Sequence, residues 1–116
     1  MSGGGYAPSA GDVVWLSFSP TAGLEQASRH PALVLSPAAY NARLGLALCC
    51  PITSQVKGHP FEVALPAGLP VEGAVLADQV RSVDWRSGHA ELACRAPKEV
   101  LPAVMSWLAV LHTLPE

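Results

Sequence analysis

Two short polar segments carry the side chains of this chain that are best suited to chemistry. Residues 25–31 read Glu-Gln-Ala-Ser-Arg-His-Pro, and residues 51–58 read Pro-Ile-Thr-Ser-Gln-Val-Lys-Gly. Together they offer a carboxylate, a guanidinium, an imidazole, hydroxyls and an ammonium, which are groups that move protons and stabilise anions. They flank a hydrophobic stretch over residues 32–50, so we expect them at strand ends, where loops present functional groups on a rigid scaffold.

The composition limits what else the chain can be. Of its 116 residues 50% are apolar and 14% are charged, with a net charge of −2. One domain of this size buries a core without disulfides, and the composition excludes disorder. There is no apolar run of ~18 residues and no signal peptide, so we expect a cytoplasmic protein without a membrane partner. Seven basic residues against nine acidic ones do not form the footprint of a strong nucleic-acid binder, although they can still cluster after folding.

The cysteines and histidines give little support to a metal site or a disulfide framework. Cys49 and Cys50 are adjacent, so they point to opposite faces of a strand, and Cys94 makes the count odd. The four histidines are scattered, without the paired spacing of a metal site. We therefore expect buried free thiols in a reducing compartment, with no metal and no cofactor.

The elements that position the polar segments are predicted from the hydrophobic pattern and the turn residues. Strands are predicted over residues 13–18, 32–36, 46–50, 61–65, 74–76, 81–85 and 89–94, with a helical turn over 37–41. Pro51 is expected to end the clean pairing of the third strand. The apolar stripe of residues 101–111 predicts a C-terminal helix that begins near Glu99, since Pro102 fits only its first turn. Many short strands at close spacing favour a small, strongly bent sheet or barrel.

Six blocks of the sequence, in order, resemble the MazF/PemK family of toxin endoribonucleases. They are residues 11–15, 20–26, 31–41, 51–58, 60–63 and 76–86. The resemblance implies a mainly β (α+β) fold, a small SH3-like barrel of short, strongly bent antiparallel strands with a C-terminal helix. We expect residues 1–10 to form a flexible tail and residues 11–116 a single toxin domain.

The resemblance also implies an activity and partners. The family members are toxins of toxin–antitoxin pairs, homodimers that cleave single-stranded RNA at short sequences without a metal. The ribose 2′-hydroxyl attacks the phosphate, and the products carry a 2′,3′-cyclic phosphate and a 5′-hydroxyl. The implied partner is a cognate antitoxin whose disordered tail wraps the toxin and blocks the RNA groove.

Individual residues take their expected roles from the resemblance. Thr53 matches the family's catalytic threonine, whose hydroxyl can donate to a phosphate oxygen; on residue type alone it reads as a threonine that bonds its own loop backbone. Glu25 is expected to orient substrate, accept from a base edge or remove a proton, against a default reading as an exposed loop carboxylate. The other expected RNA contacts are Thr21, Gln26, Tyr40, Ser54, Gln55, Lys57 and Gln79.

The chain departs from the family where the second strand opens. The family places an arginine directly before the proline, whereas this chain has His30 there and Arg29 one residue earlier. Adjacent residues of an extended segment point in opposite directions, so both cannot take the same place. Three hypotheses follow: His30 does the acid–base work, a one-residue bulge aims Arg29 at the phosphate, or the toxin is weakened or silent.

The displaced arginine also keeps a non-catalytic hypothesis open. Relatives of this barrel in the CcdB group poison DNA gyrase instead of cutting RNA. The segment around Thr53 favours the nuclease, and the exchange of Arg29 and His30 weakens that preference. An inactive binder that still sequesters the antitoxin is a third hypothesis.

Overall fold

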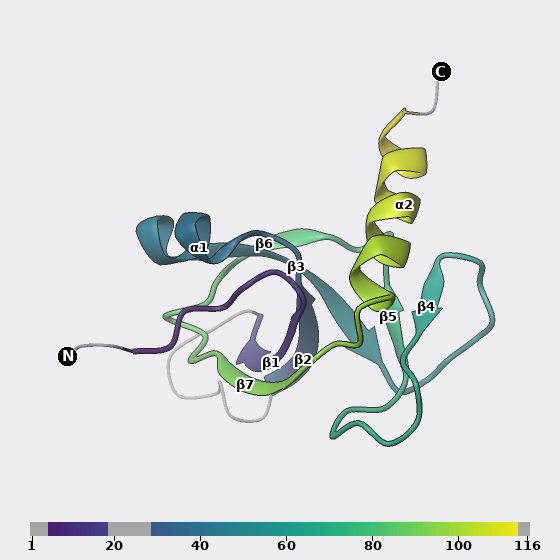
Figure 1. Cartoon of the computed structure of the whole chain (residues 1–116), viewed down its shortest axis with the longest axis horizontal. Helices are drawn as coiled ribbons and strands as arrows, with labels where there is room; N and C mark the ends of the chain where they lie inside the picture. Colours follow the sequence, from purple (N-terminus) through teal and green to yellow (C-terminus); the bar gives the residue numbers. More distant parts are fainter. Residues whose placement is uncertain (1–4, 19–28, 114–116) are drawn as a thin grey trace.

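The computed structural model describes residues 5–18 and 29–113 of the chain. Within them, a bent antiparallel sheet is accompanied by two helices (Figure 1). The strands are β1 (Asp12–Ser17), β2 (Arg29–Val34), β3 (Leu46–Thr53), β4 (Glu62–Ala64), β5 (Ala74–Leu76), β6 (Arg81–Asp84) and β7 (Glu91–Arg95), and the helices are α1 (Ala38–Leu44) and α2 (Val100–Thr113). The predicted mainly β fold with a C-terminal helix is confirmed. Within the described sheet the end strands β4 and β7 do not pair, so the expected barrel is present in an open form.

Strand β3 organises the sheet because it pairs with three other strands. The strand order is β4-β5-β3-β2-β1-β7, and β6 also pairs with β3. The first half of β3 pairs with β6, residues 49–51 pair with β2, and Ile52 and Thr53 pair with β5. The pairing of β3 with β2 ends at Pro51, but the strand itself runs past its predicted end at Cys50 and continues to Thr53. Pro51 has no N–H to donate, and it lies where β3 leaves β2 for β5, which explains why the strand continues through it.

Strand β2 begins earlier than predicted, at Arg29 rather than at residue 32. Its register with β1 is regular from the pair of Val13 and Leu33 to the pair of Ser17 and Arg29. His30 lies opposite Leu16 in this ladder. Arg29 and His30 are therefore successive strand residues, and no bulge within β2 turns Arg29 toward the face of His30.

The central strands bury both of their faces. Val13 and Cys50 belong to a cluster beneath α2, together with Val100, Val104 and Leu108 of that helix. Val14 and Cys49 belong to the cluster on the opposite face. This confirms that the adjacent cysteines point to opposite sides of their strand, and both are free and buried. Helix α2 begins at Val100, so Pro102 lies in its first turn, as predicted.

A buried polar network ties helix α1 to the sheet and to the N-terminal segment. The Asn41 side chain is fully buried and donates to the carbonyl oxygens of Pro8 at 2.8 Å and Ser36 at 2.9 Å. Its Oδ1 accepts from the Ser36 hydroxyl, and its backbone carbonyl accepts from Trp85 Nε1 at 2.9 Å. The helix ends at Gly45, whose φ of 72° is the left-handed conformation that glycine adopts without strain. Every polar atom of the buried amide therefore has a partner, as burial requires.

The N-terminal segment contacts the domain over its described part, residues 5–10. Besides the bond from Asn41 to Pro8, the Tyr6 hydroxyl donates to the buried carboxylate of Asp12. Arg95 donates to the other oxygen of Asp12 at 2.7 Å. The predicted boundary between tail and domain after residue 10 stays a prediction. In the described chain, no helix is long and apolar enough to cross a membrane.

We predict that Asn41→Ala lowers the free energy of unfolding by about 3 kcal/mol, because it leaves the buried carbonyls of Pro8 and Ser36 without donors. Urea denaturation followed by tryptophan fluorescence measures the change. Arg43→Ala, on the exposed side of the same helix, is the matched control and should change stability by no more than ~0.5 kcal/mol. Equal effects of the two substitutions would contradict the role of the network.

Candidate functional site

Thr53, at the end of β3, lines two polar pockets on the surface. The larger, of about 570 Å³, is here named the His30 pocket and is lined by Trp15, His30, Pro31, Ile52, Thr53, Ser54, Gln55, Pro70, Val71 and Glu72. The smaller, of about 250 Å³, is here named the Gln79 pocket and is lined by Thr53, Gln55, Lys57, His59, Phe61, Glu62, Leu76 and Gln79. Because Thr53 and Gln55 belong to both pockets, the two form neighbouring compartments with the threonine between them.

The position of Thr53 depends on a close approach between two backbones. Thr53 pairs with Ala74 of β5, and the residue before Ala74 is Gly73. A Cβ atom at Gly73 would lie 1.9 Å from the Thr53 carbonyl oxygen, and its φ of +125° disfavours any other residue. Glycine at this position therefore allows the loop between β4 and β5 to cross against the end of β3.

The Thr53 hydroxyl can take both roles that the sequence suggested. Its Oγ1 accepts a hydrogen bond from the backbone N–H of Gln55 at 3.0 Å. A hydroxyl has two acceptor lone pairs and one hydrogen to donate, so this loop contact leaves the hydrogen available. The local bond fixes the oxygen and lets its O–H point to an anion in either pocket.

The structure separates His30 from Arg29. The exposed His30 lines the pocket that contains Thr53, and its ring meets the edge of Phe18 with centroids 6.4 Å apart. The Arg29 guanidinium instead donates to Glu91 at 2.8 Å and to the carbonyl of Trp15 at 3.2 Å. The guanidinium is thus engaged by a carboxylate of β7, while His30 is a lining residue of the pocket.

The Gln79 pocket gathers three of the expected RNA contacts, Gln55, Lys57 and Gln79. Its shape is held by Glu62, whose carboxylate accepts from the backbone N–H groups of Lys57 and Gly58. The rings of the exposed His59 and the half-buried Phe61, which also line the pocket, stack with centroids 5.1 Å apart and planes 8° apart. Amides, an ammonium and a stacked ring pair are the groups that read unpaired bases and phosphates.

The other predicted site residues have different placements. Ser54 lines the His30 pocket. Tyr40 lines neither polar pocket and lies on an apolar groove described below. Glu25, Gln26 and Thr21 lie outside the described residues, so their expected roles stay predictions.

Sequence reasoning missed several residues that the fold brings to these pockets. Glu72 and Pro70 come from a turn-rich connection whose path over Thr53 has no local signal. Trp15 is 37% exposed and lines the His30 pocket. The stacked pair of His59 and Phe61 was also missed, although two rings spaced two residues apart in a strand-like segment would have been a usable hint.

In the described part of the chain the cysteine thiols are poor nucleophiles, and no cluster of metal-binding side chains is found. Burial raises the pKa of Cys49 and of Cys50 to about 12, and it also raises the pKa of Cys94. These thiols are therefore protonated and weakly nucleophilic near neutral pH. Residues 5–18 and 29–113 contain no group of three or more histidine, cysteine, aspartate or glutamate side chains that could hold a metal. The expected absence of a metal stays a prediction.

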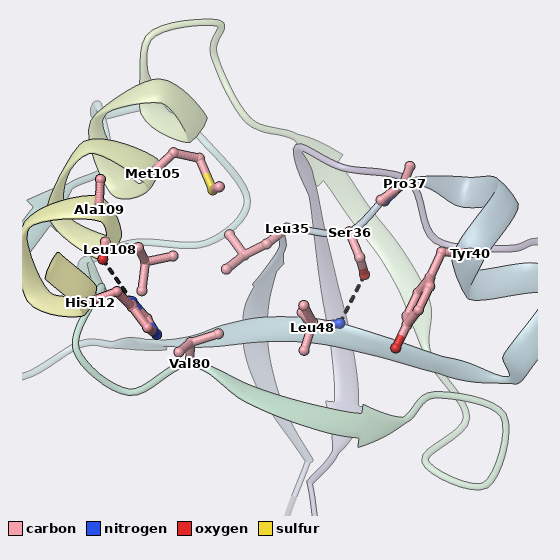
Figure 2. Close-up of a pocket in the computed structure, with 10 residues that line it drawn as sticks. All are labelled: Leu35, Ser36, Pro37, Tyr40, Leu48, Val80, Met105, Leu108, Ala109 and His112. Carbon is pink, nitrogen blue, oxygen red and sulfur yellow. Dashed lines mark hydrogen bonds between the residues drawn. The ribbon is translucent and has the colours of Figure 1, made fainter.

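An apolar groove forms a second distinct surface, between the two helices and across β3 (Figure 2). In the close-up, Leu48 and Val80 lie along its floor, Met105, Leu108 and His112 of α2 lie at one end, and Tyr40 of α1 lies at the other. Met105 is 45% exposed and Leu48 is 39% exposed. The sequence of α2 contains no Asp, Glu, Lys or Arg, so this face has little polar cover.

Comparison with known proteins matches both the fold and the sequence. The structure superposes on the crystal structure of MazF from Deinococcus radiodurans with a TM-score of 0.85 and 56% identity, covering 95% of this chain and 100% of that one. A MazE–MazF structure from the same organism gives a TM-score of 0.85 and 51% identity over 96% of this chain and all of that chain. The chain thus shares the fold of the MazF toxins.

Two sequence comparisons define the family. The chain is 49% identical over 96 residues to the endoribonuclease toxin MazF of Escherichia coli K12, covering 82% of this chain and 86% of that protein. It is 31% identical over 107 residues to the endoribonuclease PemK of Escherichia coli, covering 89% and 80% respectively. The family model of PemK-like, MazF-like toxins of type II toxin–antitoxin systems matches residues 9–112. The chain belongs to this family, as its sequence blocks predicted.

Proposed function

We propose that this protein is a sequence-specific, metal-independent endoribonuclease that acts in the cytoplasm as the toxin of a toxin–antitoxin pair. It cleaves single-stranded RNA by attack of the ribose 2′-hydroxyl, leaving a 2′,3′-cyclic phosphate and a 5′-hydroxyl. The observation that carries this proposal is the placement of Thr53 between two polar pockets, one with an imidazole and one with amides and an ammonium. The names of the relatives, endoribonucleases at 49% and 31% identity, support the same reaction.

The arrangement supplies most of what the reaction needs. Negative charge develops on the phosphorane oxygens, and an oriented Thr53 O–H can donate to one of them. His30, in the same pocket, can remove the 2′-hydroxyl proton or protonate the leaving 5′-oxygen. Lys57 in the neighbouring pocket offers a positive charge to an adjacent phosphate. Glu25 is proposed as the second acid–base group, as the family resemblance implies.

The partner of the toxin is proposed to be a cognate antitoxin. The relatives from Deinococcus radiodurans include complexes of MazF with MazE. An extended antitoxin tail would lie over the two polar pockets, and it would thereby keep RNA away from Thr53. No other class of partner is needed to explain the pockets.

Incubation of the purified protein with a long RNA in excess EDTA tests the reaction. We expect discrete cuts whose 5′ fragments end in a cyclic phosphate. Thr53→Val should lower the cleavage rate by about two orders of magnitude, because it removes one oriented donor. Thr53→Ser keeps the hydroxyl and should retain most of the activity. The absence of cuts from the folded wild-type protein would overturn the nuclease and favour a silent or gyrase-binding toxin.

His30 and Arg29 are separated by a second comparison of variants. Since Arg29 is held by Glu91 while His30 lines a pocket together with Thr53, we expect His30→Ala to slow cleavage by about tenfold or more relative to Arg29→Ala.

Thermal melts of both variants control for loss of fold. A larger loss of cleavage rate in Arg29→Ala than in His30→Ala would return the catalytic role to the guanidinium. Glu91→Gln then provides a direct check, because it releases Arg29 without removing it.

We further propose that the protein is a homodimer joined through the apolar groove. The exposed side chains of Met105, Leu48 and Tyr40 gather on one face that α2 leaves without charges. A two-fold interface sets the same patch of both copies together, so an uncharged, self-matching face suits a second copy of this chain. A charged antitoxin tail suits the polar pockets better.

Met105→Glu should convert the dimer to a monomer, because it buries an unpaired carboxylate in the interface. Light scattering coupled to size-exclusion chromatography should show a fall from twice the chain mass of 12.1 kDa to that mass. Ser106→Glu adds the same charge at an exposed neighbour that does not line the groove, and it should leave the dimer intact. A monomeric wild type, or dissociation by both variants alike, would contradict this interface.

A further inference from the structure

We infer that Glu72 is a specificity-determining residue that reads the Watson–Crick edge of one unpaired base held in the His30 pocket. The inference rests on the proposed nuclease function and adds to it a recognition element that neither polar segment contains. The base it selects carries an exocyclic amino group, as in cytosine, adenine or guanine, and uracil is rejected.

The backbone places Glu72 next to Thr53. Gly73 touches the Thr53 carbonyl so closely that no Cβ fits between them, and Glu72 directly precedes it. The Glu72 side chain lines the same pocket as Thr53 and His30. Glu72 is thus the residue directly before a close backbone contact with the proposed catalytic threonine.

The negative charge of Glu72 indicates which kind of ligand group it binds. It is the only carboxylate among the described residues that line the His30 pocket. Within the described chain no hydrogen bond or ion pair engages this carboxylate, unlike those of Glu62 and Glu91. A carboxylate repels the phosphates of an RNA backbone. Near that backbone, it can bind favourably only to a group that donates a hydrogen bond.

The walls of the pocket suit a base. The half-exposed indole of Trp15 and the rings of Pro31 and Pro70 supply apolar surface, and the volume of about 570 Å³ lies in the range of small-molecule sites. Unpaired bases are bound by stacking on aromatic side chains and by hydrogen bonds to their edges. Ser54 and Gln55 also line the pocket, and the carboxylate of Glu72 is the group that we expect to set the base preference.

Base chemistry then decides the preference. An ionised carboxylate only accepts, so it favours a base edge with an amino donor, as in the pairing of Glu with the amino group of cytosine. Uracil presents its single N–H between two carbonyl oxygens, and these oxygens face the carboxylate unfavourably. Glutamine has the same shape as glutamate but adds N–H donors, so it can accept from the uracil N–H and donate to a carbonyl.

Sequencing of cut ends from a randomised RNA pool tests the inference. For the wild-type protein we expect a short recognition word with uracil excluded at one position near the scissile bond. In Glu72→Gln that position should admit uracil, with the preference against uracil falling about tenfold or more, while the rest of the word and the cyclic phosphate ends stay unchanged. Glu99→Gln, which removes the same charge from a residue lining neither polar pocket, should leave the word unchanged.

Binding provides a readout that does not need cleavage. In a Thr53→Val background, fluorescence anisotropy compares an RNA of the wild-type word with the same RNA carrying uracil at the tested position. Adding Glu72→Gln should remove most of the difference in affinity between the two RNAs.

The outcomes separate this inference from the function on which it rests. A wild-type protein that cuts no RNA overturns the nuclease itself. Cuts with an unchanged word in Glu72→Gln overturn only the reading role. A uniform loss of rate at every site, with no change of word, also overturns it, because that pattern belongs to an acid–base group.

Discussion

The pairing of β3 with three other strands is the constraint on which the rest of the structure depends. Along its length β3 pairs first with β6, then with β2 and finally with β5, so the sheet bends where the pairing partner changes. Pro51 lies at that change, and Thr53 lies two residues later, where Gly73 brings β5 against it. The same bend separates the two polar pockets from the apolar groove. A change that moved the end of β3 would therefore disturb both the hydrophobic core and the candidate site.

The molecule divides its surface between two kinds of contact. The end of β3 and its neighbouring loops carry amides, an imidazole, a hydroxyl and a lysine around two pockets. The face of α2 carries apolar side chains and no charges. A chain with 14% charged residues has few polar groups to place, and the fold concentrates many of those that can handle an anion around one threonine. The proposed RNA site and the proposed dimer interface therefore use different surfaces.

The exchange of arginine and histidine before Pro31 has a simple structural consequence. Arg29 and His30 alternate along β2, so that the guanidinium bonds Glu91 of β7 while His30 lines a pocket together with Thr53. The guanidinium gains a charge-assisted hydrogen bond there, which also fastens β2 to β7.

The sequence by itself determined the family, the mainly β class and the placement of Thr53 near a strand end, because blocks of residue types and apolar alternation are local properties. It also determined that Cys49 and Cys50 face opposite ways, which follows from the pleat of a single strand. It did not determine that β3 continues through Pro51, because that depends on β5, which lies more than twenty residues farther along the chain. The tertiary structure paired Arg29 with Glu91, placed His30 at a pocket that Thr53 also lines, and alone brought Glu72, His59 and Phe61 to the two polar pockets. These placements depend on contacts between segments far apart in the chain, whose geometry no local pattern encodes.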